Sequence, residues 1–378
     1  MSAKKTVVPT PSTGKPLKAA NSPSAEHLHK EGSKSLFRRL LHKFIPANFD
    51  NIFGLTKRLL VEGEPAGRVA MVYSLAGLLL TPLDMFLQLF EKRLYKSATA
   101  PQLPQLFVCG APRSGTTLTA QVLIKHLPVY YFNNLTSLFP RSPIMALKLF
   151  GWMMRGTKED INFSSFYGRT TRLSFPNDAL YLWDRWMGYD RTVIPESIPN
   201  SKQDAMRRFF GAMESFSQQA SLNKNNALNT YAHLVAEVLP NAFFICLDRD
   251  PLYLIQSHYS ARKFIHGNEK VSYGIRGNVP AAEDPIEDIC RQVLFHREKI
   301  RIEQQLIGED RFLILPYEDF CQRPAYWVGL IAEKFLQVEM DIAALEKVLP
   351  PFKTTNKRKI DEAVFEKIEQ ALSRLTMH

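Results

Sequence analysis

The fold of this chain is decided by the stretch Leu106-Phe107-Val108-Cys109-Gly110-Ala111-Pro112-Arg113-Ser114-Gly115-Thr116-Thr117-Leu118. It begins as a continuous apolar run, turns at two glycines, and continues to Leu127 with the spacing of a helix. A strand, a glycine turn and a helix in this order direct successive backbone amides and the positive end of the helix dipole to one point. We therefore expect a cradle for an anion such as a phosphate or a sulfate.

The same loop departs from that of ATP-dependent enzymes. Gly110 and Gly115 keep the G-x-x-x-x-G spacing of a nucleotide-binding loop, but Thr116 stands where ATPases and kinases carry a lysine. A cation lies inside the loop instead, as Arg113, from where it could reach the bridging oxygen of a bound phosphate ester. This pattern favours a ligand with less negative charge than a magnesium triphosphate.

A second apolar run, residues 243–247, ends in Asp248-Arg249-Asp250-Pro251 and is followed by a helical pattern that contains Ser257. Ligands of open α/β sheets bind beyond the carboxyl ends of the strands. A guanidinium from Arg249 and a hydroxyl from Ser257 could meet there and hold a second phosphate. The pattern leaves open that Arg249 pairs with a neighbouring aspartate and that Ser257 lies on a helix surface.

Short apolar runs alternate with helical patterns through the rest of the chain. The expected strands cover residues 106–109, 242–247 and 312–315, and the expected helices cover 117–127, 252–263 and 286–307. Continuous apolar strands between helices indicate a parallel sheet that is covered on both faces. The predicted fold class is therefore α/β, a three-layer P-loop nucleotide-binding type with a central parallel sheet and a mainly helical N-terminal extension.

Together these motifs resemble those of the sulfotransferase superfamily, which transfers a sulfuryl group from 3′-phosphoadenosine 5′-phosphosulfate (PAPS) to an acceptor. The resemblance rests on residues 111–118 as the 5′-phosphosulfate loop and on Arg249-Asp250-Pro251 with Ser257 as the 3′-phosphate site. Further matches are Lys224-Asn225-Asn226, Pro316-Tyr317-Glu318-Asp319-Phe320 and Thr355-Asn356-Lys357-Arg358-Lys359. The resemblance extends from Gln105 to the C-terminus, and the first hundred residues carry none of it.

The resemblance implies a role for each matched residue. It implies PAPS as donor, adenosine 3′,5′-bisphosphate as product and no metal. The implied catalytic residues are Arg113, Asp178 and Lys224. The implied donor-binding residues are Arg113, Ser114, Gly115, Thr116, Thr117, Leu118, Arg249, Ser257, Lys357 and Arg358. Most cytosolic members carry a lysine where Arg113 stands, so the chain is closer to the bacterial and carbohydrate-type branch.

The general base is the point at which the motif departs from the phenol and steroid branch. That branch has a histidine where this chain has Asn226, and an uncharged amide cannot take a proton. We expect Asp178 to be the general base, although it could instead cap the helix that follows it. Glu196 is the second candidate base. His126 and His233 are expected to be surface or packing residues. The loop Ser272–Pro280, which holds two glycines, is expected to act as a lid.

Composition limits the class of protein. With 378 residues, 45% of them apolar, the chain is long enough to bury a sizeable core. Its four cysteines lack metal-ligand spacing, which argues against a disulfide scaffold and a cysteine-rich zinc site. The net charge is +11, and residues 1–43 contribute nine basic against two acidic side chains. Most of the positive excess therefore belongs to the N-terminal arm.

We expect three parts along the chain: a flexible basic tail over residues 1–35, a helical apolar pre-domain over 36–103, and a sulfotransferase domain over 104–378. The start lacks the apolar stretch of a secretory signal, which predicts a cytoplasmic protein. Residues 69–83 are uncharged, but Pro82 and Asp84 interrupt the apolar run before it reaches the length of a membrane span. We interpret it as buried or interfacial, and contact of residues 36–96 with the inner face of a membrane is left open.

The acceptor is expected to carry a hydroxyl group, and the apolar pre-domain favours a lipid or glycolipid over a soluble sugar. The sequence leaves two other classes of protein open. A P-loop nucleotide kinase or hydrolase would use Asp248 to hold magnesium. A non-catalytic membrane-associated protein would use the basic arm. A nucleic-acid partner is not expected, because no basic motif with interleaved aromatic residues is present.

Overall fold

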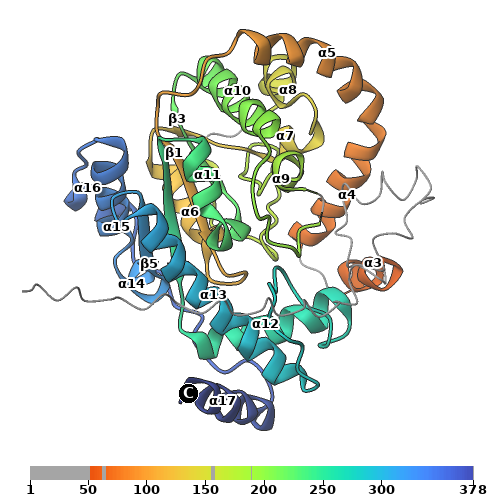
Figure 1. The fold of residues 1–378 in the computed structure, drawn as a ribbon, viewed down its shortest axis with the longest axis vertical. Helices are drawn as coiled ribbons and strands as arrows, with labels where there is room; N and C mark the ends of the chain where they lie inside the picture. The colour runs from red at the N-terminus through yellow and green to blue at the C-terminus, as the bar shows by residue number, and fades with distance from the viewer. Residues whose placement is uncertain (1–51, 62–64, 155–157, 189, 378) are drawn as a thin grey trace, which may run out of the picture. The chain divides into compact units, whose positions relative to one another are not determined.

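The computed structural model describes residues 52–61, 65–154, 158–188 and 190–377, so the expected basic tail and the start of the pre-domain lie outside the described residues. Its centre is a parallel sheet in the order β2-β3-β1-β4-β5 (Figure 1). The strands are β1 (Gln105–Gly110), β2 (Val129–Tyr130), β3 (Ala220–Lys224), β4 (Ala242–Asp248) and β5 (Phe312–Pro316). The expected α/β class is confirmed.

Alternate residues of β1 supply the two apolar layers beside the sheet. Phe107 and Cys109 pack on one face with the helices α7 to α11 and part of α13, whereas Leu106 and Val108 pack on the other with α6, α14, α15 and α16. A third apolar cluster joins α12, α13 and α17. The sheet is therefore covered on both faces, as the continuous apolar strands predicted.

Helices account for most of the rest of the described chain (Figure 1). In the N-terminal extension and the first half they are α3 (Ile52–Val61), α4 (Pro65–Leu79), α5 (Thr81–Ser97), α6 (Thr116–His126), α7 (Asn134–Leu138), α8 (Pro143–Phe150) and α9 (Leu180–Met187). The second half holds α10 (Asn200–Ser217), α11 (Ala232–Val238), α12 (Pro251–His266), α13 (Pro285–Ile307), α14 (Tyr317–Gln322), α15 (Pro324–Ile331), α16 (Ile342–Val348) and α17 (Glu362–Thr376). Short turns of other helix types are η1 (Gly151–Met153), η2 (Lys158–Asp160), η3 (Asn226–Thr230) and η4 (Ala332–Leu336).

The carboxyl ends of the parallel strands meet at one edge of the sheet. Val108 of β1 pairs with Lys224 at the end of β3, and Gly110 pairs with Leu247 of β4. Asp248 at the end of β4 pairs with Pro316 of β5. The glycine loop after β1, Lys224 and Arg249 are therefore neighbours because of the strand order alone.

The pre-domain is helical where it is described. No single helix among the described residues combines the length and apolar content of a membrane span, and α4 with α5 passes such a test only as a pair bent by 67°. The break falls at Leu80, just before Pro82 in the first turn of α5. These helices pack against the remainder of the fold: α5 contacts α8 and α10, α4 contacts α7, and α3 contacts α12.

Candidate active site

The two glycines of the loop adopt backbone conformations that other residues rarely adopt. Gly110 and Gly115 have φ angles of 144° and 101°, and a Cβ at Gly115 would lie 2.4 Å from ring carbons of Tyr317. A side chain at Gly115 is thus excluded twice, by the left-handed conformation and by the ring. The amides of Thr116, Thr117 and Leu118 form the first turn of α6, where backbone donors have no intrahelical acceptor.

Two carbonyls of this loop are tied to neighbouring elements. His258 Nε2 lies 2.6 Å from the carbonyl oxygen of Pro112, and Arg249 Nη1 donates to the carbonyl of Arg113 at 2.9 Å. Burial lowers the pKa of His258 from 6.5 to about 3, so the ring is neutral and Nε2 carries the proton that it donates. These bonds hold the loop carbonyls toward β4 and α12.

Arg113 lies over the cleft with a positive φ of 73°. Its Nε donates to Ser257 Oγ at 3.3 Å, and its guanidinium lies 4.7 Å from the centre of the Tyr167 ring. Ser257 is therefore not a free hydroxyl on the surface of α12, and that alternative is wrong. The side chain of Arg113 is aimed by a hydrogen bond on one side and by a cation–π contact on the other.

Arg249 is almost fully buried, with 6% of its surface exposed, and makes no ion pair with its aspartate neighbours. Its guanidinium donates to Thr355 Oγ1 at 3.0 Å and to Asn356 Oδ1 at 2.8 Å, and it stacks on Tyr317 at 4.9 Å. The expected alternative of a local ion pair is wrong. Burial lowers the pKa of Arg249 but leaves an arginine charged.

Lys224, Asp178 and Thr117 form a compact polar cluster. Lys224 Nζ lies 2.7 Å from Asp178 Oδ1 and donates to Thr117 Oγ1 at 3.2 Å. The backbone of Gly168 covers the cluster, because a Cβ there would lie 3.4 Å from Lys224 Nζ and 3.7 Å from Asp178 Oδ2. Asp178 does not cap α9, whose N-cap residue is Ala179, so the capping alternative is wrong.

Arg113, Thr117, Asp178, Lys224 and Arg249 line one cleft of about 780 Å³. Ser114 and Ser257, two of the expected donor-binding residues, are not part of its lining. Its positively charged side chains are Arg113, Arg141, Arg169, Arg185, Arg191, Lys224 and Arg249, against the carboxylates Asp178, Asp184 and Asp190. Both oxygens of Asp184 accept from Arg191, at 2.8 and 2.7 Å. Asp190 accepts from Thr192 at an exposed turn. Of these three carboxylates, Asp178 is the one paired with a buried lysine beside the glycine loop.

Several expected residues lie elsewhere. Lys357 and Arg358 are exposed and are absent from the cleft lining, and Arg358 pairs with Glu362 instead. Glu196 is exposed outside the cleft. His233 binds Glu303 at 2.9 Å, and Asp248, the residue that magnesium would need, is held through both oxygens by Arg297 at 3.0 and 3.1 Å. His126, half-buried near the end of α6, also lies away from the cleft.

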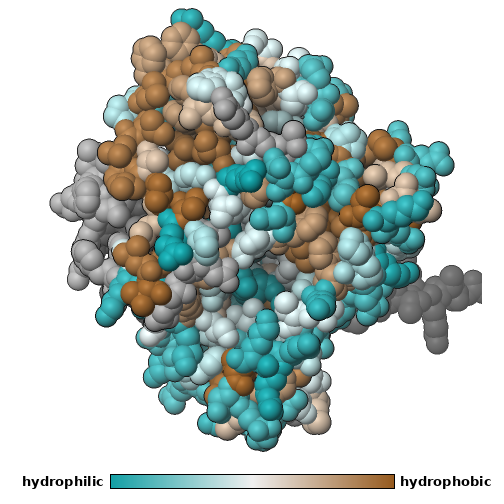
Figure 2. Space-filling model, turned by 180° about the vertical axis from the view of Figure 1, so that it is seen from behind, coloured by the Kyte–Doolittle hydropathy of each residue, from teal (hydrophilic) through white to brown (hydrophobic). Residues whose placement is uncertain are grey.

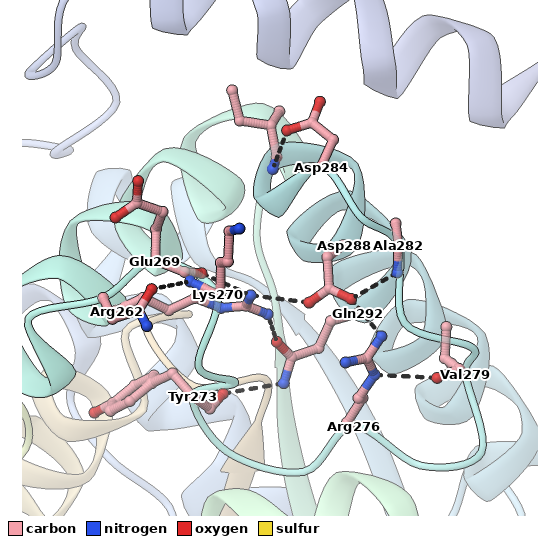
Figure 3. Close-up of polar contacts among 12 residues, drawn as sticks. Arg262, Glu269, Lys270, Tyr273, Arg276, Val279, Ala282, Asp284, Asp288 and Gln292 are labelled. Atoms are coloured by element: carbon pink, nitrogen blue, oxygen red, sulfur yellow. Dashed lines mark hydrogen bonds and ion pairs between the residues drawn. The ribbon is translucent and has the colours of Figure 1, made fainter. Parts of the chain in front are cut away.

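The segment expected to form a lid, Ser272–Pro280, lies against the glycine loop. A Cβ at Gly274 would come within 2.7 Å of Pro112. Figure 3 shows how the loop is tied down: Arg262 binds Asp288 at 2.9 Å and Gln292 at 2.8 Å, and Gln292 donates to the carbonyl of Tyr273 at 3.0 Å. The first two bonds join α12 to α13 and position Gln292, and a lid motion would have to break the bonds from Gln292 to the carbonyls of Tyr273 and Ile275.

The family of the chain follows from comparison with known proteins. A family model described as the sulfotransferase family matches residues 104–341. The chain belongs to the sulfotransferase family. A protein-tyrosine sulfotransferase of Drosophila melanogaster is 24% identical over 245 residues, which are 65% of this chain and 40% of the relative. The match thus spans less than half of the length of that relative.

Solved sulfotransferase structures share the fold of this family member. The sulfotransferase STF9 of Mycobacterium avium matches with a TM-score of 0.51 and 14% identity, over 90% of this chain and 95% of STF9. STF1 of Mycobacterium tuberculosis H37Rv matches with a TM-score of 0.51 and 11% identity, over 90% of this chain and 99% of STF1. The predicted superfamily is confirmed, and both neighbours are bacterial, in keeping with the predicted branch.

The sequence missed several residues of this sulfotransferase site. The sequence does not mark His258, although it follows Ser257 directly, and Gly168 carries no local motif. Among the aromatic residues between the two phosphate motifs, Tyr167, Tyr181 and Trp183 line the cleft, whereas Trp186 is buried in the core. Each missed contact joins segments far apart in the chain, so sequence spacing offered no signal for it.

Proposed function

We propose that this protein transfers the sulfuryl group of PAPS to a hydroxyl group of an acceptor by in-line displacement. The observation that carries the proposal is the convergence of two anion-binding groups on one loop. Arg249 reaches the carbonyl of Arg113 at 2.9 Å, and Ser257 lies 3.3 Å from Arg113 Nε. Both groups would hold one phosphate of an adenosine nucleotide, and the amides of the loop that they contact would hold the phosphate at its other end.

The residues present fit such a donor. The amides of Thr116, Thr117 and Leu118 and the hydroxyl of Thr117 would hold the 5′-phosphate, and Arg249 with Ser257 would hold the 3′-phosphate. Ser114 Oγ is buried and has no hydrogen-bond partner in the described part of the chain, which leaves it one more donor for the loop ligand. Lys357 and Arg358 would need to move to take part, so we assign them no contact.

The donor would supply an activated sulfuryl group whose sulfur–oxygen bond to the 5′-phosphate breaks as the acceptor oxygen bonds to sulfur. Asp178 would take the proton of the acceptor hydroxyl through its free oxygen. Arg113 and Lys224 would neutralise the negative charge that develops on the leaving oxygen and on the sulfuryl group. Arg113 can only stabilise charge, because a guanidinium does not lose its proton near neutral pH. The Arg and Lys side chains thus act as electrostatic groups and Asp178 as the base.

For the acceptor we propose the reacting group, which is a hydroxyl. A hydroxyl fits a cleft in which the proposed base, Asp178, lies next to Lys224 and Thr117. The name of the Drosophila relative indicates a phenolic hydroxyl as acceptor for that protein. Tyr167, Tyr181 and Trp183 give this cleft an apolar wall that would suit an aromatic, sugar or lipid acceptor.

Thermal stability tests the donor assignment. Adenosine 3′,5′-bisphosphate at 100 times its dissociation constant should stabilise the protein by about 2.7 kcal/mol without magnesium, because it binds the native state alone. Adenosine 5′-monophosphate and ATP at that concentration should give a clearly smaller shift. Arg249→Ala should abolish the shift, whereas Arg297→Ala, which removes an arginine outside the cleft, should retain it. A full shift in Arg249→Ala would contradict the 3′-phosphate site.

A further inference from the structure

Two helices beside the cleft turn apolar side chains to solvent. On α4, Val72, Leu75 and Leu79 are exposed at spacings of three and four residues, with Leu79 72% exposed. They form one stripe along the helix. In the part of the chain that the structure describes, this stripe stays exposed to solvent.

The first half of α5 continues this surface. Met85, Phe86, Leu89 and Phe90 are exposed, and the rings of Phe86 and Phe90 contact each other with centroids 5.5 Å apart. Figure 2, which views the molecule from behind, shows hydrophobic residues gathered at the upper left, on the side where α4 and α5 lie. We call these exposed residues of both helices the α4–α5 face. Contiguous exposed apolar patches of this kind mark interaction sites in folded proteins.

The basic residues of the two helices are exposed, whereas the acidic residues are buried. Arg68 of α4 and Lys92, Arg93 and Lys96 of α5 are all exposed. The described acidic residues of these helices, Asp84 and Glu91, are both buried. Among the described residues of α4 and α5, the exposed charges beside the α4–α5 face are therefore all positive.

The buried acids have an internal role that accounts for their position. Glu91 accepts from the amides of Ile144 and Met145 at 3.1 and 2.8 Å, and Asp84 accepts from Ser142 Oγ at 2.7 Å. Both carboxylates thus accept hydrogen bonds at the start of α8. They lie inside the fold and do not neutralise the positive charge of the surface lysines and arginines. An apolar surface flanked by basic residues is complementary to a bilayer that contains anionic lipids.

The geometry favours lying on a bilayer over crossing it. The apolar residues are divided between two helices bent by 67°, and each helix has polar and buried contacts on its other side. Helices of this kind lie in the plane of the interface with one face inserted at the head-group boundary.

The two helices that carry the α4–α5 face also contribute to the wall of the cleft. Tyr73 and Ser74 of α4 and Gln88 of α5 line the cleft, and each is next in sequence or one turn away from an exposed apolar residue. Arg141 approaches Gln88 at 3.5 Å from the cleft side. A molecule held in a membrane surface against these helices would therefore have its polar end next to the cleft.

We propose that the α4–α5 face docks on an anionic lipid bilayer, and that the cleft takes an amphipathic lipid with a hydroxyl-bearing head group from that surface. The docking step stands on the exposed face alone. The choice of acceptor rests on the proposed sulfuryl transfer.

Vesicle flotation with the full chain tests the docking step. The protein should float with vesicles of phosphatidylcholine mixed with phosphatidylglycerol, and more weakly with phosphatidylcholine alone. The double variant Phe86→Ser/Leu89→Ser should weaken binding by at least about tenfold, since each buried side chain of this size favours transfer out of water by roughly 1.5–3 kcal/mol. The matched control Leu306→Ser/Val348→Ser removes exposed apolar residues from α13 and α16 and should change binding by less than about twofold.

A charge variant tests the electrostatic part. Lys92→Gln/Lys96→Gln should weaken binding to the anionic vesicles on the order of 25-fold, because each basic residue near such a surface contributes roughly fivefold. The control Lys334→Gln/Lys347→Gln neutralises two exposed lysines elsewhere and should have little effect. Residues 1–51 are kept in every variant, so their own affinity for lipid cancels in the comparison.

The outcomes separate docking from donor chemistry. Equal binding of the Phe86→Ser/Leu89→Ser variant and its control, or no binding of the unaltered chain to the anionic vesicles, would overturn the docking proposal. So would light scattering that shows a dimer broken by the same variant, because the face would then join two copies.

Stabilisation by adenosine 3′,5′-bisphosphate is measured without vesicles, so failure of either proposal is recognised independently. Label from PAPS carrying radioactive sulfur should enter extracted vesicle lipid but not water-soluble sugars, and the reverse would overturn the acceptor assignment.

Discussion

We assign Asp178 as the base because of the groups that lie next to its two carboxylate oxygens. One oxygen is held 2.7 Å from Lys224, and the other faces the cleft beneath Gly168. The lysine fixes the carboxylate beside Thr117 of the glycine loop. The oxygen that does not face Lys224 is therefore the one we propose as acceptor for the proton of a hydroxyl in the cleft.

Asp178→Asn should lower kcat by about 10²–10⁴-fold, the range that a positioned base contributes. Donor binding should be nearly unchanged, since Arg249, Ser257 and the loop amides remain, and the shift in melting temperature with adenosine 3′,5′-bisphosphate measures this. Glu196→Gln is the matched control, because it neutralises the other candidate base outside the cleft. A loss of kcat in Glu196→Gln with normal turnover in Asp178→Asn would reverse the assignment.

Two buried histidines make the stability of the fold depend on pH. Burial lowers the pKa of His258 from 6.5 to about 3 and that of His296 from 6.5 to about 4. Below pH 6.5 the unfolded chain takes up protons on these residues while the folded protein does not. The free energy of unfolding should therefore fall as pH decreases from 6.5 toward 4, by up to about 1.4 kcal/mol per pH unit for each histidine.

Urea unfolding at a series of pH values measures this slope. His258→Gln keeps a side-chain donor for the carbonyl of Pro112. The variant should lose the contribution of one histidine to the change in the free energy of unfolding with pH. Burial raises the pKa values of Asp84, Glu91 and Asp184, and these groups act in the opposite direction. They are common to both proteins, so the difference in slope isolates His258. An identical slope in the variant would mean that folding does not lower the pKa of His258.

Residue roles could be predicted where one short motif carries them. Arg113, Arg249 and Ser257 lie in motifs next to the ends of strands, and the strand order brings them together. His258 and Thr355 act through bonds to segments 146 and 106 residues away, so no local pattern marks them. Lys357 and Arg358 follow Asn356, which holds Arg249, but their own side chains lie outside the cleft.

Among the elements, the segment between α12 and α13 depends on a buried ion pair. Arg262 is fully buried and binds Asp288, which also accepts from Arg276 and from the amide of Ala282 (Figure 3). Removing one partner of such a pair leaves the other charge buried without compensation. The segment over the glycine loop is thus held by a few strong contacts.

Asp288→Ala should lower the free energy of unfolding by about 3–5 kcal/mol. It should also speed amide hydrogen exchange in residues 268–283 more than in β1, because the anchor of that segment is lost. Glu287→Ala is the matched control: its carboxylate pairs with Arg291 at 2.5 Å on the half-exposed side of α13, and it should cost no more than about 0.5 kcal/mol. Equal effects of the two substitutions would show that Asp288 does not anchor the segment.

The strands divide into those that the sequence predicts and those that it does not. β1, β4 and β5 are continuous apolar runs, and their positions agree with prediction within two residues. β3 reads Ala-Ser-Leu-Asn-Lys, which predicts no strand. Its buried Ser221 and Asn223 are satisfied by partners outside the strand: Ser221 Oγ donates to Gln105 at 2.6 Å, and Asn223 Oδ1 accepts from Phe132 N at 3.1 Å. Such partners become visible only in the fold, and β2, with two residues, is too short for any periodicity.

Across the whole molecule, α3 to α5 are joined to the sulfotransferase fold by specific polar bonds. Arg58 of α3 donates to the carbonyls of Phe264 and Ile265 at the end of α12, at 2.6 and 3.0 Å. Glu91 of α5 caps α8. The sequence predicts these helices from their apolar content, but it does not predict that their carboxylates face inward. We therefore propose that the expected parts 36–103 and 104–378 fold as one cooperative unit in the region that is described.

Glu91→Ala tests this cooperativity. The substitution leaves the amides of Ile144 and Met145 and the hydroxyl of Tyr95 without their acceptor, and each buried unsatisfied group costs about 1–3 kcal/mol. If the helices and the sheet form one unit, calorimetry should show a single transition at a lower temperature, with α5 and β1 losing hydrogen-exchange protection together. Glu333→Ala, an exposed substitution at η4, should leave the transition within about 0.5 kcal/mol of its original stability. Two separate transitions in Glu91→Ala, with the melting of β1 unchanged, would mean that the N-terminal helices are an independent module.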